Sequence, residues 1–393
     1  MKNLYKKIMI IIFSLFLVTM PILTIVYLSP EERPFSENEN RYLAKFPTLS
    51  AETYKNKKFM NGFDTWISDR FIGREQWIEL KNTSNKIIGK TEINGVFIEN
   101  NMMMEAWEGY DREVYEKNLN AINNFANNHK NIQMFFMLAP NAQEIYKNNI
   151  PAFAPVENQK KFIEGFYSSL MGFEGTIDVY SALQEKSESS YIYYRTDHHW
   201  TSFGAFLAYQ AAAPALGYES YPYSAFEIEH ASHDFRGTLF SKTLDFGVTP
   251  DIIDYYTVAK GEPEVKVSVY DKYDNSTGKI KYKEYDSMYF RDFLEVKDKY
   301  SSFLGQNSPL VTIENPAAKS EKRLLVIKDS YAHSLVPFLS KEYQKVTMID
   351  LRYINTDFQT MAPLSDYDQL LFMYNVITFS QDDSNIIKLN MCK

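Results

Sequence analysis

The stretch YYRTDHHWT at residues 193–201 places a carboxylate, two imidazoles and an indole next to one another. Side chains two residues apart in an extended segment point to the same side, so Asp197 is expected to orient His199. A histidine oriented in this way can activate a weak hydroxyl nucleophile. His198 should point to the opposite side. A buried, satisfied His–Asp pair explains the pattern equally well, and these residues alone do not separate the two interpretations.

The stretch LVIKDSYAHS at residues 325–334 offers the hydroxyl. Ser330 follows a short apolar run and precedes a helix-like segment, and ligands of open α/β sheets bind at such strand ends. Backbone N–H groups of the next turn would be available to an oxyanion. Taken alone, Ser330 is better explained as a helix N-cap. Together, the two stretches predict a triad of Asp197, His199 and Ser330.

Weaker candidates for holding an oxyanion or the substrate are Asn375, Arg352 and Tyr331. Asn375 ends the apolar run at 370–374, and Arg352 lies just past the run that ends near Asp350. Both are therefore expected at the sheet edge where Ser330 lies. An ordinary loop contact or ion pair is the simpler interpretation of each. Residues 235–238 form either a substrate loop or, more simply, a turn.

Neither a metal nor a cofactor is predicted. His198 and His199 are adjacent rather than four residues apart on a helix, so both cannot easily face one ion. The remaining side chains considered for a metal site are His230, His233, Asp234 and His333. The sequence contains no glycine-rich phosphate loop and no dinucleotide fingerprint.

The pattern of apolar residues predicts an α/β fold with a parallel sheet flanked by helices. Nearly continuous apolar runs suit strands buried on both faces, and they occur at 132–138, 324–327, 346–349 and 370–374. Helical spacing occurs at 51–90, 111–128, 162–171 and 202–216. The segments that start near Ser334 and Asp357 are long enough for crossover helices. Residues 260–320 are expected to form an antiparallel, β-rich insertion.

Composition excludes some classes of function. The chain has 393 residues, of which 45% are hydrophobic and 23% charged, as in ordinary globular proteins. Its formal net charge of −8 argues against nucleic acid as a partner, because phosphate binding needs a basic face. The single cysteine, Cys392, can form neither an internal disulfide nor a cysteine metal site.

The N-terminal segment is predicted to anchor the chain in a membrane. Lysines precede an uncharged run at 8–28, and about 20 residues at ~1.5 Å each span a hydrocarbon core of ~30 Å. The charges place the N-terminus in the cytoplasm and the remainder outside. Bulky residues at 25–27 disfavour a cleaved signal peptide, which is the alternative. We expect an anchor at 1–28, a linker at 29–50 and one domain at 51–393.

The run TDHHWT at 196–201 resembles the motif of the DHHW proteins, which are similar to the alginate O-acetyltransferase proteins of the SGNH hydrolase-like superfamily. Supporting similarity lies at 39–43, 69–71, 94–97 and 235–239. The resemblance implies a triad of Asp197, His199 and Ser330. It also implies a circularly permuted SGNH fold, because the serine comes last instead of first. Asn375 would then occupy the position of the superfamily's oxyanion asparagine.

The resemblance further implies an O-acyltransferase, most simply an O-acetyltransferase, that modifies a secreted or cell-wall polysaccharide. A membrane acyltransferase of the MBOAT kind would supply the acyl group. The expected location is the cell membrane, with a single pass, a cytoplasmic N-terminus and an extracellular catalytic domain. Two alternatives stay open, namely a polysaccharide acetylesterase with the same triad and a non-catalytic exopolysaccharide biosynthesis or export subunit.

Overall fold

A computed structural model of the chain describes residues 2–26, 34–151, 153–258, 264–274, 276 and 279–392. The chain folds as two compact units. One comprises Met1–Ile93 with Phe240–Phe246, and the other comprises Asn94–Leu239 with Gly247–Lys393. Residues 51–93, which the sequence analysis assigned to the large domain, thus belong to the N-terminal unit. Residues 27–33, where anchor and linker were expected to meet, lie outside the described residues.

The N-terminal unit is mainly helical. Its elements are α1 (Lys2–Val26), β1 (Phe35–Ser36), β2 (Arg41–Tyr42), α2 (Ala51–Lys55), α3 (Lys58–Arg70), α4 (Arg74–Ile87) and β3 (Glu92–Ile93). Within α1, the segment Leu4–Val26 is long and apolar enough to cross a membrane, a property that signal sequences share. Asp69 accepts two hydrogen bonds from the Arg41 guanidinium, at 2.7 and 3.0 Å, and one from the Ala44 N–H. The polar residues of 39–43 and 69–71 thus stabilise this unit internally.

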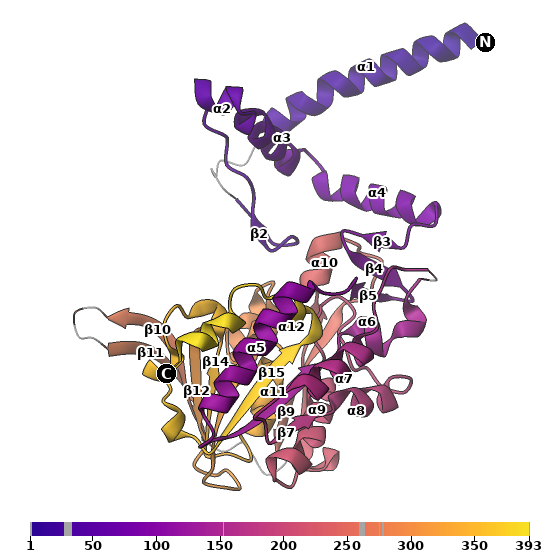
Figure 1. The fold of residues 1–393 in the computed structure, drawn as a ribbon. Helices are drawn as coiled ribbons and strands as arrows, with labels where there is room; N and C mark the ends of the chain where they lie inside the picture. Colours follow the sequence, from indigo (N-terminus) through magenta and orange to yellow (C-terminus); the bar gives the residue numbers. More distant parts are fainter. Residues whose placement is uncertain are drawn as a thin grey trace. The chain divides into compact units, whose positions relative to one another are not determined.

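The second unit is built on a large, mostly parallel sheet (Figure 1). Within the described residues its strand order is β11-β10-β12-β14-β13-β15-β6-β7. The strands from β14 to β7 are parallel, whereas β11, β10 and β12 pair antiparallel. The bounds are β6 (Gln133–Ala139), β7 (Gly175–Ile177), β10 (Lys266–Asp274), β11 (Lys279–Tyr285), β12 (Leu310–Glu314), β13 (Arg323–Lys328), β14 (Lys345–Ile349) and β15 (Gln369–Asn375). The four predicted parallel strands are thereby confirmed.

Both faces of the sheet are buried, which explains why its strands are continuously apolar. Successive residues of a strand point to opposite faces, so Phe135 and Met137 pack into one hydrophobic cluster and Phe136 into the other. The first cluster includes α8 (Val179–Lys186), α9 (Ser202–Leu216) and α11 (Ala332–Leu339). The second includes α5 (Arg112–Asn128), α7 (Gln159–Ser169) and α12 (Val376–Gln381) (Figure 1).

Helix α9 has the bounds expected from the sequence. The Thr201 hydroxyl accepts a hydrogen bond from the Gly204 N–H at its start, and Gly217, with a φ of 73°, ends it in the left-handed region. The crossover from β13 to β14 contains α11, as expected. The crossover from β14 to β15 differs, because the described segment that starts near Asp357 forms only short 3-10 turns, η6 (Phe358–Thr360) and η7 (Leu364–Asp366).

The expected insertion at 260–320 extends the sheet at its β14 side. Strands β10 to β12 add to the edge as an antiparallel continuation, and residues 260–263, 275, 277 and 278 of this region lie outside the described residues. Two antiparallel hairpins complete the unit. Their strands are β4 (Val96–Glu99) with β5 (Met102–Glu105), and β8 (Phe226–Phe235) with β9 (Asp251–Val258).

Candidate active site

Ser330 lies at the carboxyl end of the central strand β13. The strand ends at Lys328 and α11 begins at Ala332, so Ser330 occupies the turn between them and stays partly exposed. Its hydroxyl oxygen is 2.7 Å from Nε2 of His199. Two segments far apart in the chain therefore meet at the edge where α/β sheets bind their ligands.

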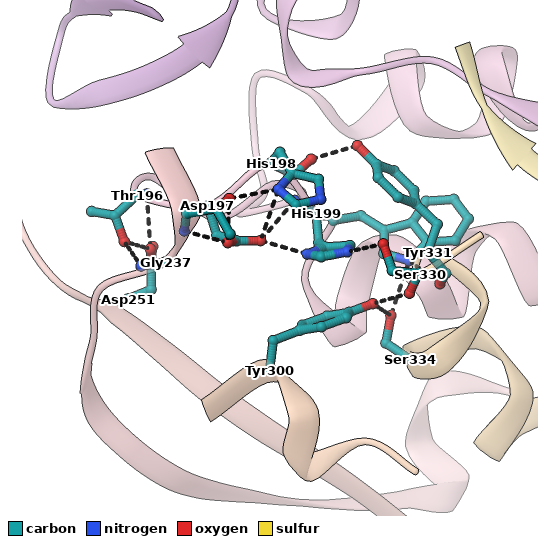
Figure 2. Close-up of polar contacts among 12 residues, drawn as sticks. Thr196, Asp197, His198, His199, Gly237, Asp251, Tyr300, Ser330, Tyr331 and Ser334 are labelled. Carbon is teal, nitrogen blue, oxygen red and sulfur yellow. Dashed lines mark hydrogen bonds and ion pairs between the residues drawn. The ribbon is translucent and has the colours of Figure 1, made fainter. Parts of the chain in front are cut away.

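His199 and Asp197 lie in a bent loop rather than in the extended segment that we expected. The loop is closed by an antiparallel bridge between Tyr193 and Trp200. Oδ1 of Asp197 accepts from the His199 N–H at 3.0 Å and lies 2.5 Å from its Nδ1 (Figure 2). A carboxylate can only accept, so Nδ1 carries the ring proton and Nε2 is left to accept from the Ser330 hydroxyl.

The other oxygen of Asp197 is held by the start of helix α10 (Thr238–Thr243). Oδ2 accepts from the Thr238 N–H at 2.8 Å and from its hydroxyl at 3.0 Å. The preceding Gly237 passes so close that a Cβ there would lie 2.2 Å from Oδ2. The stretch at 235–238 thus supports Asp197, a role that we did not anticipate. The sequence feature that could have indicated this role is the glycine, because only glycine permits such a close approach.

A second buried carboxylate holds the loop in place. Asp251, on β9, accepts hydrogen bonds from the backbone N–H groups of Arg195 and Thr196 at 2.7 and 2.8 Å. It also accepts from the hydroxyl of Thr196, as Figure 2 shows, and from the hydroxyl of Tyr191. The residues just before Asp197 are therefore fixed from the side opposite to Ser330's strand, and nothing in the local sequence pattern identified Asp251.

Burial and neighbouring charges set the protonation states of the pair. Burial alone would raise the pKa of Asp197, but His198, His199 and the Thr238 N–H hold that pKa well below its usual range. Burial and the neighbouring His198 lower the pKa of His199 to about 4, against the opposing effect of Asp197. At neutral pH the site therefore contains an ionised Asp197 and a neutral His199, which is able to accept a proton.

Tyr300 forms the floor beneath the imidazole. Its ring stacks on His199 with centroids 3.7 Å apart and planes 8° apart, and its hydroxyl donates to the Ser330 carbonyl oxygen at 3.0 Å (Figure 2). The same hydroxyl lies 3.1 Å from Oγ of Ser334. Burial raises the pKa of Tyr300, which keeps the phenol neutral. Tyr300 could not be predicted from the sequence, because one aromatic residue in a region of many carries no local signal.

The backbone N–H of Ser330 is a candidate oxyanion donor. Within the described part of the chain it has no hydrogen-bond acceptor, whereas the Tyr331 N–H donates to Asp329 at 2.9 Å. The Tyr331 side chain is buried, and its hydroxyl donates to the carbonyl oxygen of His198. Tyr331 thus braces the histidine loop from within and does not face a substrate.

Asn375 lies at the expected sheet edge, but its amide is occupied. Nδ2 donates to Oδ2 of Asp329 at 2.6 Å and to Oγ1 of Thr378 at 2.7 Å. Its Oδ1 accepts from Nδ2 of Asn141 at 3.1 Å. In this arrangement Asn375 caps α12 and holds Asp329, and it has no amide proton left for an oxyanion. Asn141 follows β6, so the rule that selected Asn375 would also have found Asn141.

Arg352 is bound to a carboxylate beside the site. Its guanidinium donates to both oxygens of Asp350, at 2.7 and 2.9 Å, and its charge is among the influences that lower the pKa of His199. Asp350 also pairs with the buried Lys328 at 3.2 Å. Lys328 in turn donates to Nε2 of His333 at 2.7 Å. The lysine that precedes Asp329 is thus accommodated by a buried polar network.

The other histidines differ in their surroundings. The centre of the His198 ring lies 3.9 Å from the centre of the His199 ring, so it does not point to the opposite side as we expected. Nδ1 of His198 is 2.6 Å from the hydroxyl of Thr238, the residue that holds Asp197. His198 therefore contacts Thr238 and not Ser330. In the described part of the chain, Asp197, His198 and His199 are the one group of three side chains close enough to share an ion. His230, on the β8–β9 hairpin, pairs with Asp254. His333 belongs to the Lys328 network.

Comparison with known proteins places the chain in a family. The family model described as DHHW protein matches residues 104–349. A DHHW family protein from Eubacterium siraeum has a similar structure, with a TM-score of 0.63 and 22% identity over 77% of this chain and 97% of that one. PatB1 of Bacillus cereus gives a TM-score of 0.61 and 20% identity over 75% and 99% of the two chains.

A second structure of PatB1, with a sulfonyl adduct, gives a TM-score of 0.59 and 20% identity over 76% and 100% of the chains. No curated protein sequence matches this chain significantly. At these identities the structural similarity establishes the fold, and the family model covers well over half of the chain, including all three residues of the predicted triad. The chain belongs to the DHHW protein family.

Proposed function

We propose that this protein is an extracytoplasmic O-acyltransferase, with acetyl as the transferred group and a secreted or cell-wall polysaccharide as the acceptor. The observation that carries the proposal is the continuous chain of contacts from Asp197 through His199 to Ser330, at 2.5 and 2.7 Å. Ser330 is the nucleophile, His199 the general acid and base, and Asp197 the group that orients His199.

The first half of the reaction forms an acyl-enzyme. Ser330 Oγ attacks the carbonyl carbon of the acyl donor while its proton passes to Nε2 of His199. The resulting oxyanion accepts a hydrogen bond from the Ser330 N–H. When the tetrahedral intermediate collapses, the bond to the leaving group breaks and His199 returns the proton to that group. Asp197 stays ionised throughout and stabilises the transient imidazolium.

The second half transfers the acyl group to a sugar. His199, neutral again, takes the proton of the acceptor hydroxyl as its oxygen attacks the ester carbonyl. A second oxyanion forms at the same backbone N–H. Its collapse releases the acylated sugar, and Ser330 recovers the proton from His199. Water in place of the sugar hydroxyl gives hydrolysis by the same steps, so the esterase alternative differs only in which acceptor reaches the acyl-enzyme.

The location and donor belong to the proposal. We infer that α1 anchors the chain in the cell membrane, with a cytoplasmic N-terminus and the sheet unit outside, because lysines precede the apolar segment. No acyl-CoA exists outside the cell, so a multi-pass membrane acyltransferase of the MBOAT kind would supply the acetyl group. The order Asp197, His199, Ser330 along the chain supports a circularly permuted SGNH fold.

Acetyl transfer to cell-envelope polysaccharide tests the proposal. Cells lacking this protein would be complemented with the wild type, with Ser330→Ala, or with Ser168→Ala. Ser168 is an exposed serine of α7 whose hydroxyl donates to the carbonyl oxygen of Gly165, so it provides a matched control. We expect polysaccharide acetylation with the wild type and the control, and none with Ser330→Ala.

Three outcomes separate the candidate functions. Normal acetylation with Ser330→Ala would overturn the proposal and favour the non-catalytic subunit. Increased acetylation in cells lacking the protein, reversed by the wild type and by Ser168→Ala but not by Ser330→Ala, would instead identify an esterase. Loss of acetylation that Ser168→Ala restores and Ser330→Ala does not restore is the result that the acyltransferase predicts.

A further inference from the structure

A tyrosine-lined groove lies at the end of the large sheet where Ser330 also lies. The hollow measures about 710 Å³, within the range of ~300–1,000 Å³ typical of pockets for small ligands. Its walls come from the β10–β11 hairpin, which ends the sheet, and from the segment that follows β14. The aromatic side chains that line it are Tyr270, Tyr273, Tyr282 and Tyr353.

We propose that this groove is a subsite for the acceptor polysaccharide, which holds several sugar rings while one hydroxyl is presented to Ser330. The inference rests on the proposed acyltransferase function and adds the place where the acceptor binds. None of the residues of this groove belongs to the triad or its supports.

The tyrosines of the groove are unusually exposed. Tyr273, Tyr282 and Tyr353 are 53%, 40% and 50% exposed, although aromatic rings of this size are usually buried more deeply. A tyrosine offers a flat apolar face together with a polar hydroxyl, which matches the apolar face and hydroxyl rim of a sugar ring. Several such rings around one hollow suit a chain of sugars better than they suit a single small molecule.

The polar groups of the groove point to the same class of ligand. Asn355, Thr356 and Thr360 line one wall, and Lys279 lies on the hairpin. Amide and hydroxyl groups can both donate and accept, so they can match the hydroxyls of a sugar. A lipid chain would gain nothing from them. The wall that carries these residues is the irregular β14–β15 crossover, where 3-10 turns replace the expected helix.

The register of the sheet places the groove at the same end of the sheet as Ser330. Ile327 of β13 pairs with Ile349 of β14, and Ser330 and Arg352 each follow three residues later. Neighbouring strands lie ~4.8 Å apart, so the chain leaves the sheet beside Ser330 and enters the groove wall directly after Arg352. The Arg352 guanidinium lies 5.8 Å from the centre of the Tyr353 ring, and its charge acts on His199. The groove wall thus begins next to a residue whose charge acts on the site.

Direct binding measurements test the groove without any acyl donor. The full-length protein in detergent micelles would be titrated calorimetrically with three hexasaccharides, namely those of β-1,4-linked glucose, N-acetylglucosamine and mannuronate. The variants are Tyr353→Ala, Tyr353→Phe and Tyr282→Ala. Lys283→Ala is the control, because residue 283 neighbours Tyr282 on β11, points to the opposite side of the strand and is exposed. Thermal melts would establish that each variant is folded.

We expect saturable binding of at least one hexasaccharide. Each alanine variant should weaken that binding by about three- to tenfold, as loss of one aromatic contact implies. Tyr353→Phe keeps the ring and should retain most of the affinity, and Lys283→Ala should retain all of it. Absence of binding by all three glycans, or equal affinity of the folded alanine variants and the wild type, would overturn the proposal.

The result is independent of the test on Ser330. If the tyrosine variants bind glycan normally while Ser330→Ala abolishes acetylation, the proposed role of the groove is wrong and the proposed acyltransferase function is retained. If the tyrosine variants lose affinity while Ser330→Ala still acetylates, the groove binds glycan and the proposed chemistry is wrong.

Discussion

Replacing Gly237 with alanine should disable the site without removing any side chain that takes part in the reaction. The added methyl would lie 2.2 Å from Oδ2 and 2.5 Å from Cγ of Asp197, whereas ordinary van der Waals contact begins near 3.4 Å. Asp197 or the 235–238 loop must therefore move by about 1 Å. Asp197 cannot move alone, because both of its oxygens are fixed by His199 and Thr238.

The displacement should lower activity far more than stability. Misplacement by ~1 Å in an active site costs about 100-fold, and loss of the carboxylate that orients a catalytic histidine costs up to about 10⁴-fold. We expect kcat/KM for p-nitrophenyl acetate to fall by at least about 100-fold, or ~2.7 kcal/mol of transition-state stabilisation. Overpacking of this kind destabilises folded proteins by about 1–3 kcal/mol, so the variant should still fold.

Gly165→Ala is the matched control. A Cβ at Gly165, within helix α7, meets nothing within 4 Å, and alanine is the better helix former by about 0.5–1 kcal/mol. It should leave kcat/KM unchanged and keep or raise the melting temperature. Wild-type kcat/KM in a folded Gly237→Ala protein would refute the idea that the close approach of residue 237 fixes Asp197.

Three further predictions concern the surroundings of the triad. The acid limb of the pH–kcat/KM profile should report His199, whose pKa is lowered to about 4. Activity depends on the neutral imidazole, so it should persist above about pH 4 and be lost as the pH falls through that value. A midpoint near 6.5 would contradict the lowered pKa. Tyr300→Leu removes the ring stacked on His199 and should lower kcat about tenfold. Tyr300→Phe keeps the stacked ring and should lower kcat by less. Equal kcat values for the two variants would rule out a role for stacking. Lys328→Met leaves Asp350 buried without its lysine partner and should destabilise the fold by about 3 kcal/mol in urea unfolding. An unchanged midpoint would contradict this prediction and show that Arg352 alone is enough to pair Asp350.

The parts of the fold that follow local rules could be predicted from the sequence. Continuous apolar runs identified β6, β13, β14 and β15, since strands buried on both faces have no polar side to interrupt them. The bounds of α9 followed from its threonine cap and its terminal glycine. The helix predicted in the crossover after β14 was wrong. The segment is long enough for a helix, but its residues form short 3-10 turns.

The supports of the candidate site could not be predicted in the same way. The triad residues belong to two short stretches whose chemistry is visible in the sequence. Thr238, Asp251 and Tyr300 act on them from elements remote in the chain, and their positions depend on how the hairpins and loops pack. For Asn375 the position could be predicted, but the hydrogen bonds could not. Its place at the sheet edge was predictable, but its amide protons are used by Asp329 and Thr378, which only tertiary structure reveals.

Detection of an acyl-enzyme tests the central claim most directly. The full-length protein would be mixed with p-nitrophenyl acetate, quenched in acid within milliseconds to seconds, digested and analysed by tandem mass spectrometry. We predict one acetyl ester on Ser330, with none in Ser330→Ala and a strongly reduced amount in His199→Ala. An acetyl group on another residue, or equal labelling of the wild type and Ser330→Ala, would contradict the account.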